Sequence, residues 1–293
     1  MAQEMATTTM DHELAKTMAI YKQGRVSNEL AELRATRGAL DVASVYSVST
    51  MHYCGDEAIL AFAQAAGLQP AGSTGRKMRV LDLGSGHGGD SMRLASEYHT
   101  HVTALEVQDA IHLEALKLTR ELGFSDDSLS HVCADICQAP APAEPELLYD
   151  CCHTALVILH IPDRARVFGQ ICSSLQPGGI LFIEDMFALR ELTEEDRADL
   201  AGPVACPYLP SEEAYRRDLA EAGLELVRWQ DMTEAWTEFT ASRAEAFRSA
   251  SDRHSRVHGP ALLGDLLHFY DTVVGLFKRG NLGGVRIVAR KKA

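Results

Sequence analysis

The segment VLDLGSGHGGD, residues 80–90, constrains the fold more than any other part of the sequence. An apolar run leads into Gly84, Gly86, Gly88 and Gly89, and SMRLA then begins a helix. Glycines at such a turn allow positive φ angles and let a ligand approach the backbone, while the following helix N-terminus offers unpaired amides. The segment therefore predicts a ligand-binding strand–loop–helix unit, although its spacing alone also satisfies the dinucleotide fingerprint.

From Met78 onward, short apolar runs alternate with helical stretches, which is typical of a parallel α/β sheet. The expected strands cover 79–84, 101–107, 129–136, 147–154, 179–187, 224–230 and 285–290. The expected helices cover 89–98, 109–122, 163–175 and 211–222.

The chain divides into two expected parts. Residues 1–70 have helical, amphipathic patterning and form an N-terminal lid segment that a Gly/Pro/Ser-rich linker follows. Residues 71–293 form the α/β domain, with helical insertions at 191–222 and 233–278.

Three acidic residues stand close to strand ends around the glycine loop. Asp82, two residues before Gly84, can brace the loop, and Glu106, 18 residues after Gly88, suits the two hydroxyls of a ribose. Asp135, at the end of the third expected strand, can accept a hydrogen bond from an adenine amino group. An acidic rim disfavours a pyrophosphate and favours the positive sulfonium of S-adenosylmethionine (SAM), which we therefore expect as the cofactor.

Composition narrows the possible partners and location. A formal net charge of −13 disfavours binding to nucleic acid, and no apolar run approaches the roughly 20 residues that a membrane span needs. The N-terminus lacks a secretory pattern, and the seven cysteines show no disulfide or zinc spacing, so we expect a cytoplasmic protein. No metal site is expected, because no two histidine, cysteine or acidic residues fall at ligand spacing within a confidently expected element.

These motifs resemble the class I SAM-dependent methyltransferases. The matching segments are 81–89, Glu106, 134–136, 149–164 and 175–185, within a resemblance that covers about 78–290. Within that class, the chain is most similar to the sarcosine/dimethylglycine and phosphoethanolamine N-methyltransferases. The narrower likeness depends on LHIPDR, on PGG followed by IED, on MHYCGDEAI (51–59) and on the closing KRGNLGGVRIVARK.

The resemblance implies a Rossmann-like, seven-stranded, mostly parallel sheet in which the last strand is antiparallel. The glycine loop would contact the methionine part of SAM, and the acid at the end of the second strand would bind the ribose. The fourth strand would face the sulfonium and the acceptor. The cofactor-binding residues that it implies are Asp82, Gly84, Ser85, Gly86, Glu106, Val107, Asp135, Ile136 and Thr154.

The acceptor site is less determined, because methyl transfer needs a shaped pocket and at most one base. His160, just past the fourth strand, is the candidate general base, and His52 is a second candidate on a segment that would fold over the cofactor. Both histidines also have a purely structural interpretation. The candidate acceptor-binding residues are Tyr21, Tyr46, Tyr53, Glu184, Asp185 and Trp236.

The expected function is SAM-dependent methylation of a small, polar acceptor, such as sarcosine or dimethylglycine, by an enzyme that can form a homodimer. Sulfur, oxygen and arsenic acceptors remain alternatives, and arsenic would need Cys54, Cys152 and Cys206 to converge. A nicotinamide-dependent oxidoreductase and a non-catalytic partner subunit are the remaining hypotheses.

Overall fold

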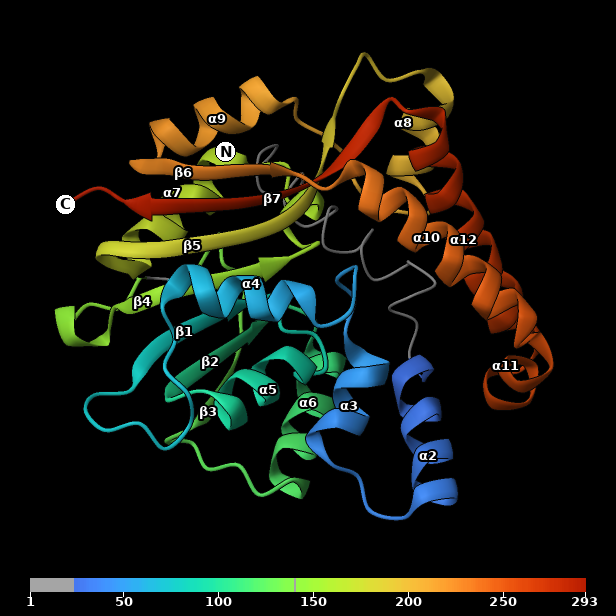
Figure 1. The fold of residues 1–293 in the computed structure, drawn as a ribbon, viewed down its shortest axis with the longest axis horizontal. Helices are drawn as coiled ribbons and strands as arrows, with labels where there is room; N and C mark the ends of the chain where they lie inside the picture. The colour runs from blue at the N-terminus through green and yellow to red at the C-terminus, as the bar shows by residue number, and fades with distance from the viewer. Residues whose placement is uncertain (1–23, 140) are drawn as a thin grey trace.

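The protein folds around one seven-stranded sheet with helices on both faces (Figure 1). The computed structural model describes residues 24–139 and 141–293. The strand order is β3-β2-β1-β4-β5-β7-β6, in which β7 is antiparallel to both of its neighbours. This confirms the predicted Rossmann-like, mostly parallel sheet and the antiparallel pairing of the last two strands.

The strands coincide with runs of the sequence that are rich in apolar residues. They are β1 (Met78–Leu83), β2 (Thr100–Glu106), β3 (Leu129–Cys133), β4 (Tyr149–Ala155), β5 (Leu175–Ala188), β6 (Leu224–Asp231) and β7 (Leu282–Lys291). The inner residues of β4 and most of β7 are buried whichever face they point to. A parallel sheet requires this pattern, because helices cover both of its faces.

One strand is shorter than the sequence suggests. We predicted the third strand to run to residue 136, but β3 ends at Cys133. The Asp135 carboxylate accepts a hydrogen bond from the Cys137 amide at 2.8 Å, and an aspartate that bonds the backbone two residues ahead forms a turn instead of continuing a strand. Asp135 therefore lies in the loop after β3.

The helices form two layers and a protruding pair. They are α2 (Arg25–Arg37), α3 (Val42–Ser49), α4 (Glu57–Ala66), α5 (Gly89–Glu97), α6 (Asp109–Glu121), α7 (Arg164–Ser174), α8 (Glu194–Ala201), α9 (Glu212–Glu221), α10 (Thr233–Ser249), α11 (Ser251–His258) and α12 (Pro260–Arg279). Helices α4 and α5 pack in one core cluster, and α7 and α9 pack in another on the opposite face of the sheet.

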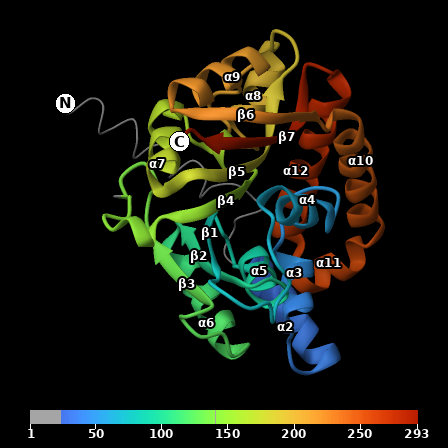
Figure 2. The same ribbon diagram turned by 60° about the vertical axis from the view of Figure 1, so that its left-hand side comes forward.

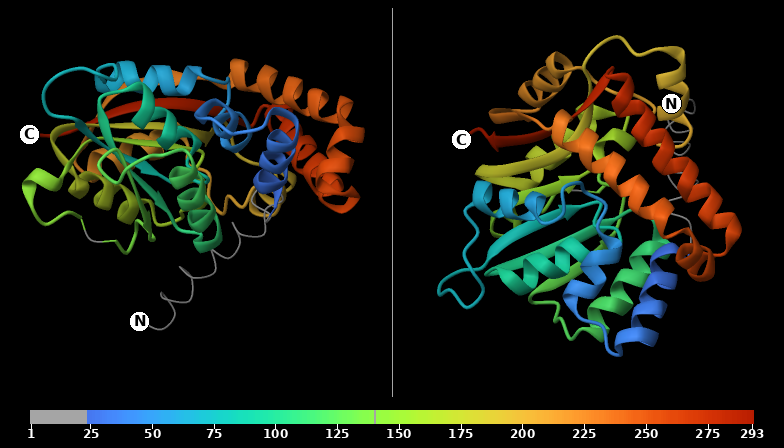
Figure 3. Two further views of the ribbon diagram at one scale, coloured as in Figure 1. Left: turned by 90° about the horizontal axis from the view of Figure 1, so that it is seen from below. Right: turned by 45° about the vertical axis from the view of Figure 1, so that its right-hand side comes forward.

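The predicted insertion at 233–278 consists of helices. Figures 2 and 3 show α10 and α12 side by side off the strand ends where β6 ends and β7 begins, joined by α11, which lies near α2. Helices α8, α10 and α12 share a core cluster with Tyr53 and Met186. The inserted helices therefore pack beside the carboxyl end of β5, where the site described below begins. The predicted division of the chain at residue 70 remains a proposal.

None of the helices between residues 24 and 293, residue 140 aside, combines the length and the apolar character needed to cross a membrane. All seven cysteines of the sequence lie in the described part of the chain, and none of them forms a disulfide.

Candidate active site

A cavity of about 120 Å³ lies at the carboxyl ends of the central strands, and we call it the cofactor cavity. Of the cofactor-binding residues predicted from the sequence, all line it except Asp82 and Thr154. The lining residues are 49–52, 83–86, 89, 90, 105–108, 134–136, 155, 157, 160 and 161. Three strand ends and the segment after α3 thus enclose one space.

The glycine loop has a shape that only glycine permits. Gly84 has a φ of +72°, and a Cβ atom there would lie 2.4 Å from a Val157 methyl carbon. Gly86 has a φ of +54°, and a Cβ atom there would point into open space. Between them, the Ser85 hydroxyl is buried, lines the cavity and has no hydrogen-bond partner. A backbone open on one side, with an unsatisfied hydroxyl, fits a polar ligand such as the methionine part of SAM.

Glu106 closes β2 with its carboxylate held against the glycine loop. It accepts hydrogen bonds from the backbone amides of Gly86 at 3.0 Å and Gln108 at 2.8 Å, and only 6% of the residue is exposed. Burial raises the pKa of Glu106, which these amide hydrogen bonds partly offset. A carboxylate fixed in this way can accept charge-assisted hydrogen bonds from the two hydroxyls of a ribose.

Asp82 lies beneath the loop and outside the cofactor cavity. Its carboxylate accepts a hydrogen bond from the Ser91 hydroxyl at the start of α5, and it lies 3.0 Å from Nδ1 of His153 on β4. Burial alone would lower the pKa of His153, but the hydrogen bond and charge of Asp82 raise it. Asp82 therefore ties β1 to α5 and β4, and its predicted role in bracing the glycine loop stays a proposal.

The residues predicted to frame the adenine lie on the far side of the cofactor cavity. Asp135 and Ile136 both line it, and the Asp135 carboxylate also accepts a hydrogen bond from the Gln138 side chain at 2.9 Å. Thr154 is fully buried in β4 and does not line the cavity; its neighbour Ala155 does.

The two candidate bases differ in position. His160 lines the cofactor cavity, and its Nδ1 donates a hydrogen bond to the carbonyl oxygen of Ala205 at 2.9 Å. This bond fixes the tautomer, so Nε2 is the basic nitrogen, and burial lowers the pKa of His160. His52 also lines the cavity, but its Nε2 lies 3.3 Å from both Asp90 and the Tyr46 hydroxyl. His160 remains the candidate base that lines both this cavity and the one described next.

A second space, which we call the apolar cavity, adjoins the first. It has a volume of about 30 Å³, and it shares Met51 and His160 with the cofactor cavity. The lining residues are Met51, Tyr53, Leu156, Leu159, His160, Met186, Val204, Arg243, Phe269 and Val273. Its position next to His160 makes it the candidate acceptor pocket.

Of the predicted acceptor-binding residues that the structure describes, Tyr53 alone lines the apolar cavity. The Glu184 carboxylate forms an ion pair with Arg286 at 2.6 Å, and Asp185 accepts a hydrogen bond from the Tyr215 hydroxyl at 2.6 Å. Tyr46 packs under Arg93, whose guanidinium carbon lies 4.6 Å from the ring centroid. Trp236 is fully buried, and a Cβ atom on Gly284 would lie 2.2 Å from its ring. Tyr21 lies outside the described residues.

Two charged lining residues were missed from the sequence. Asp90 lines the cofactor cavity at the first turn of α5, and its carboxylate accepts a hydrogen bond from Thr50 at 3.1 Å. Its position directly after the glycine loop was the available signal. Arg243 follows Phe239 by one helical turn within the predicted insertion, but nothing in the local sequence indicates that this helix reaches the site.

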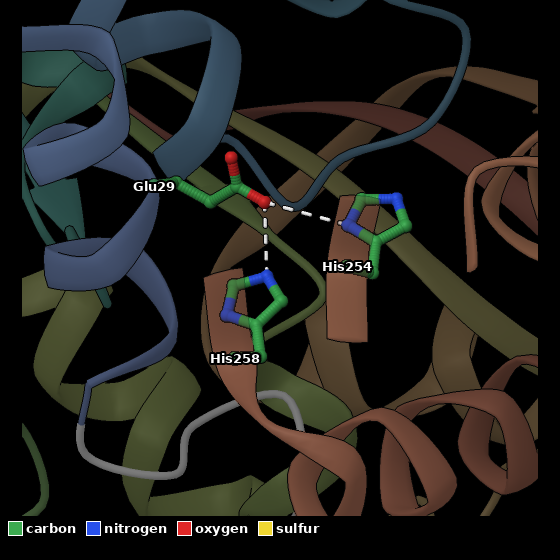
Figure 4. A group of neighbouring side chains, drawn as sticks. All are labelled: Glu29, His254 and His258. Carbon is green, nitrogen blue, oxygen red and sulfur yellow. Dashed lines mark hydrogen bonds and ion pairs between the residues drawn. The ribbon is translucent and has the colours of Figure 1, made fainter. Parts of the chain in front are cut away.

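A separate cluster lies where α2 meets α11 (Figure 4). A Glu29 oxygen lies 2.9 Å from Nε2 of His258 and 3.6 Å from Nδ1 of His254, and the three ligand atoms are within 4.8 Å of one another. Arg253 also binds Glu29, with distances of 2.5 and 3.0 Å to its two oxygens. The sequence analysis did not anticipate this cluster, because Glu29 and His258 are 229 residues apart.

Comparison with known proteins assigns this chain to one family. Residues 56–228 match the family model described as a methyltransferase domain. The glycine/sarcosine/dimethylglycine N-methyltransferase of Actinopolyspora halophila is 28% identical over 53% of this chain and 27% of its own length. Phosphoethanolamine N-methyltransferase 1 of Zea mays is 25% identical over 68% of this chain and 37% of its own length. The chain thus spans about a quarter to two fifths of the length of these two relatives.

A solved structure, that of a putative sarcosine dimethylglycine methyltransferase from Galdieria sulphuraria, superposes on this fold with a TM-score of 0.70. It is 17% identical, and the superposition covers 91% of this chain and 97% of that one. At this identity the likeness concerns the fold.

Proposed function

This chain belongs to the methyltransferase-domain family, as one of the class I SAM-dependent methyltransferases, and from that premise we propose that it transfers a methyl group from SAM to the nitrogen of a small amine or amino-acid-like acceptor. The observation that carries the proposal is the position of His160, which lines both the cofactor cavity and the apolar cavity. An acceptor in the second cavity would thus meet the cofactor beside a base.

Different residues of the chain would bind SAM, exclude water and accept the proton in such a reaction. SAM, when bound, supplies an electrophilic methyl group on its sulfonium. The glycine loop and Glu106 hold the nucleoside and methionine parts, and residues 49–52 cover the cavity and exclude water. His160, which burial keeps in its neutral form at pH 7, takes the proton that the acceptor nitrogen loses. Alignment and a single base suffice for this displacement.

The alternatives find less support. A thiolate-bound arsenic acceptor needs cysteines that converge on the pocket, and neither Cys54, Cys152 nor Cys206 lines either cavity. Cys152 lies in the core cluster with α7, whereas Cys206 lies in the cluster with α10 and α12. The names of the two N-methyltransferase relatives also favour a nitrogen acceptor over an oxygen or sulfur acceptor.

The direct test is release of S-adenosylhomocysteine from the full chain, supplied with SAM and one acceptor at a time. Primary and secondary amines and amino acids form one panel, and matched alcohols and thiols form a second. We expect turnover with members of the first panel and a product methylated on nitrogen by mass spectrometry. Turnover confined to alcohols or thiols would contradict nitrogen transfer.

A further inference from the structure

The walls of the apolar cavity match a molecule with a hydrocarbon body. Leu156, Leu159, Phe269 and Val273 present aliphatic and aromatic surface to the cavity. Met51 and Met186 add thioether side chains, which adapt to irregular occupants, so the cavity can widen beyond its volume of about 30 Å³. A fully polar acceptor would gain little from such walls, because its own hydrogen bonds to water would be lost without replacement.

One cation faces these apolar walls. The guanidinium carbon of Arg243 lies 4.7 Å from the ring centroid of Tyr53, 5.1 Å from that of Tyr270 and 5.3 Å from that of Phe239. Its Nε atom is buried and has no hydrogen-bond partner. A buried N–H group that is left unsatisfied costs about 1–3 kcal/mol, and more on a charged group, so the arginine is stabilised by any occupant that accepts this bond.

The charges of two buried arginines, Arg164 and Arg286, are balanced by carboxylates. Arg164 lies 2.8 Å from the Asp218 carboxylate, and Arg286 lies 2.6 Å from that of Glu184. Within the described part of the chain, no carboxylate lies at ion-pair distance from Arg243. The aromatic rings stabilise its charge in part, but they accept no hydrogen bond at Nε. The pocket therefore has one positive charge to offer an occupant.

We propose that the acceptor is a small carboxylic acid with an apolar body, whose carboxylate binds Arg243 while its amine lies beside His160. This deepens the proposed function and rests on it. A single guanidinium balances one negative charge, whereas a phosphomonoester would place a second, uncompensated charge among apolar walls. A carboxylate also matches the planar fork of an arginine through two parallel hydrogen bonds.

In the reaction, the acceptor ammonium first gives a proton to Nε2 of His160, and the lone pair left on the nitrogen forms a bond to the methyl carbon as the carbon–sulfur bond breaks. The bonding electrons remain on the sulfur, which becomes a neutral thioether, and the methylated nitrogen carries the positive charge. Arg243 acts on binding and orientation and takes no part in these bond changes.

Binding is the first test, because it needs no turnover. Isovalerate and its uncharged analogue isovaleramide are titrated into the full chain saturated with S-adenosylhomocysteine. We expect isovalerate to bind at least tenfold more tightly than the amide. Arg243→Met, which keeps an apolar stem of similar length, should remove this preference, and Arg243→Lys should restore part of it. Arg248→Met, on the same helix but 47% exposed, is the matched control and should bind as the unaltered chain does.

Turnover is the second test. The probes are leucine, leucinamide, 3-methylbutylamine, sarcosine and phosphoethanolamine. We expect the lowest KM for leucine, and a rise of ten- to a hundredfold in that KM in Arg243→Met with a smaller change in kcat. Affinity for S-adenosylhomocysteine should not change in this variant, which separates a binding role from general damage to the fold.

Three results would overturn the proposal. They are equal binding of isovalerate and isovaleramide, equal KM effects of Arg243→Met on leucine and leucinamide, and preferred turnover of sarcosine or phosphoethanolamine over leucine. Methylation of 3-methylbutylamine or sarcosine in preference to leucine would still support nitrogen transfer. Failure of every amine to release S-adenosylhomocysteine would instead count against the proposed function.

Discussion

The carboxylate of Glu106 is the side chain that we propose binds the ribose of SAM. It is buried at the end of β2 and is already oriented by two backbone amides. We expect Glu106→Ala to weaken SAM binding by about 1–3 kcal/mol, because hydrogen bonds to a charged group are lost. Calorimetric titration measures the affinity, with Glu121→Ala on the exposed end of α6 as the control. An affinity equal to that of the unaltered chain would show that Glu106 does not hold the ribose.

His160 gives a prediction about pH as well as rate. A base must be neutral to accept a proton, and burial lowers the pKa of His160 from its ordinary value of 6.5. Activity should therefore persist below pH 6.5 and fall only as the pH drops through the lowered pKa. His160→Gln should reduce kcat about a hundredfold and abolish this acid limb, because a general base typically contributes 10²–10⁴-fold.

The control for His160 is the affinity for SAM. A loss of kcat with an unchanged dissociation constant supports the role of a base. A parallel loss of SAM affinity and of thermal stability would assign His160 a structural role through its bond to Ala205 instead.

At the residue scale, the sequence predicts the lining of the cofactor cavity better than the lining of the apolar cavity. Gly84, Ser85 and Glu106 were identifiable because backbone geometry and strand ends restrict which residue types fit there. Glu184 could not be placed in the same way, because its partner Arg286 is 102 residues away in sequence and lies on an antiparallel strand. Short-range sequence patterns do not reveal whether an acid at a strand end forms an ion pair with a residue so distant in the sequence.

At the scale of elements, the contact between α2 and α11 joins the N-terminal helices to the inserted ones. Burial alone would raise the pKa of Glu29, but hydrogen bonds from His258 and Arg253 lower it from 4.5 to about 2. A carboxylate with a lowered pKa stabilises the fold fully above its unfolded value, and this stabilisation is lost as the pH falls through its folded value. The contact therefore acts above about pH 4.5 and weakens toward pH 2.

We expect Glu29→Gln to lower the free energy of unfolding by about 1–2 kcal/mol at pH 7, allowing for partial screening by solvent. Denaturant unfolding measures this, and the difference from the unaltered chain should shrink as the pH falls from 4.5 toward 2. Glu32→Gln is the matched control, because Glu32 lies on the same helix and binds the exposed Arg256 at 3.1 Å. Equal effects of the two substitutions would mean that the buried Glu29 cluster adds no more stability than the exposed ion pair of Glu32.

The elements themselves were mostly predictable, and the exceptions have local causes. Apolar runs identified the central strands most clearly, because strands buried on both faces have little freedom in composition. The Asp135 turn that shortens β3 depends on a side-chain hydrogen bond, which a hydrophobic pattern does not register. The insertion at 233–278 was predicted as helical, but its packing beside the acceptor pocket is a long-range property.

At the scale of the whole molecule, the fold brings three strand ends, a glycine loop and the segment after α3 around one cavity. The inserted helices α10 and α12 then supply part of the adjoining apolar cavity through Arg243, Phe269 and Val273. We therefore propose that acceptor binding depends in part on the insertion, whereas no residue of the insertion lines the cofactor cavity. Changes in the insertion should alter acceptor choice without altering SAM affinity.

The central claim is that the cofactor cavity holds the adenosine of SAM. Titration calorimetry of the full chain with S-adenosylhomocysteine and, separately, with NADH tests this claim most directly. We predict one molecule of S-adenosylhomocysteine bound per chain and no measurable binding of NADH. At a free concentration one hundred times its dissociation constant, S-adenosylhomocysteine should raise the free energy of unfolding by about 2.7 kcal/mol. Binding of NADH, or the absence of binding by S-adenosylhomocysteine, would contradict the account.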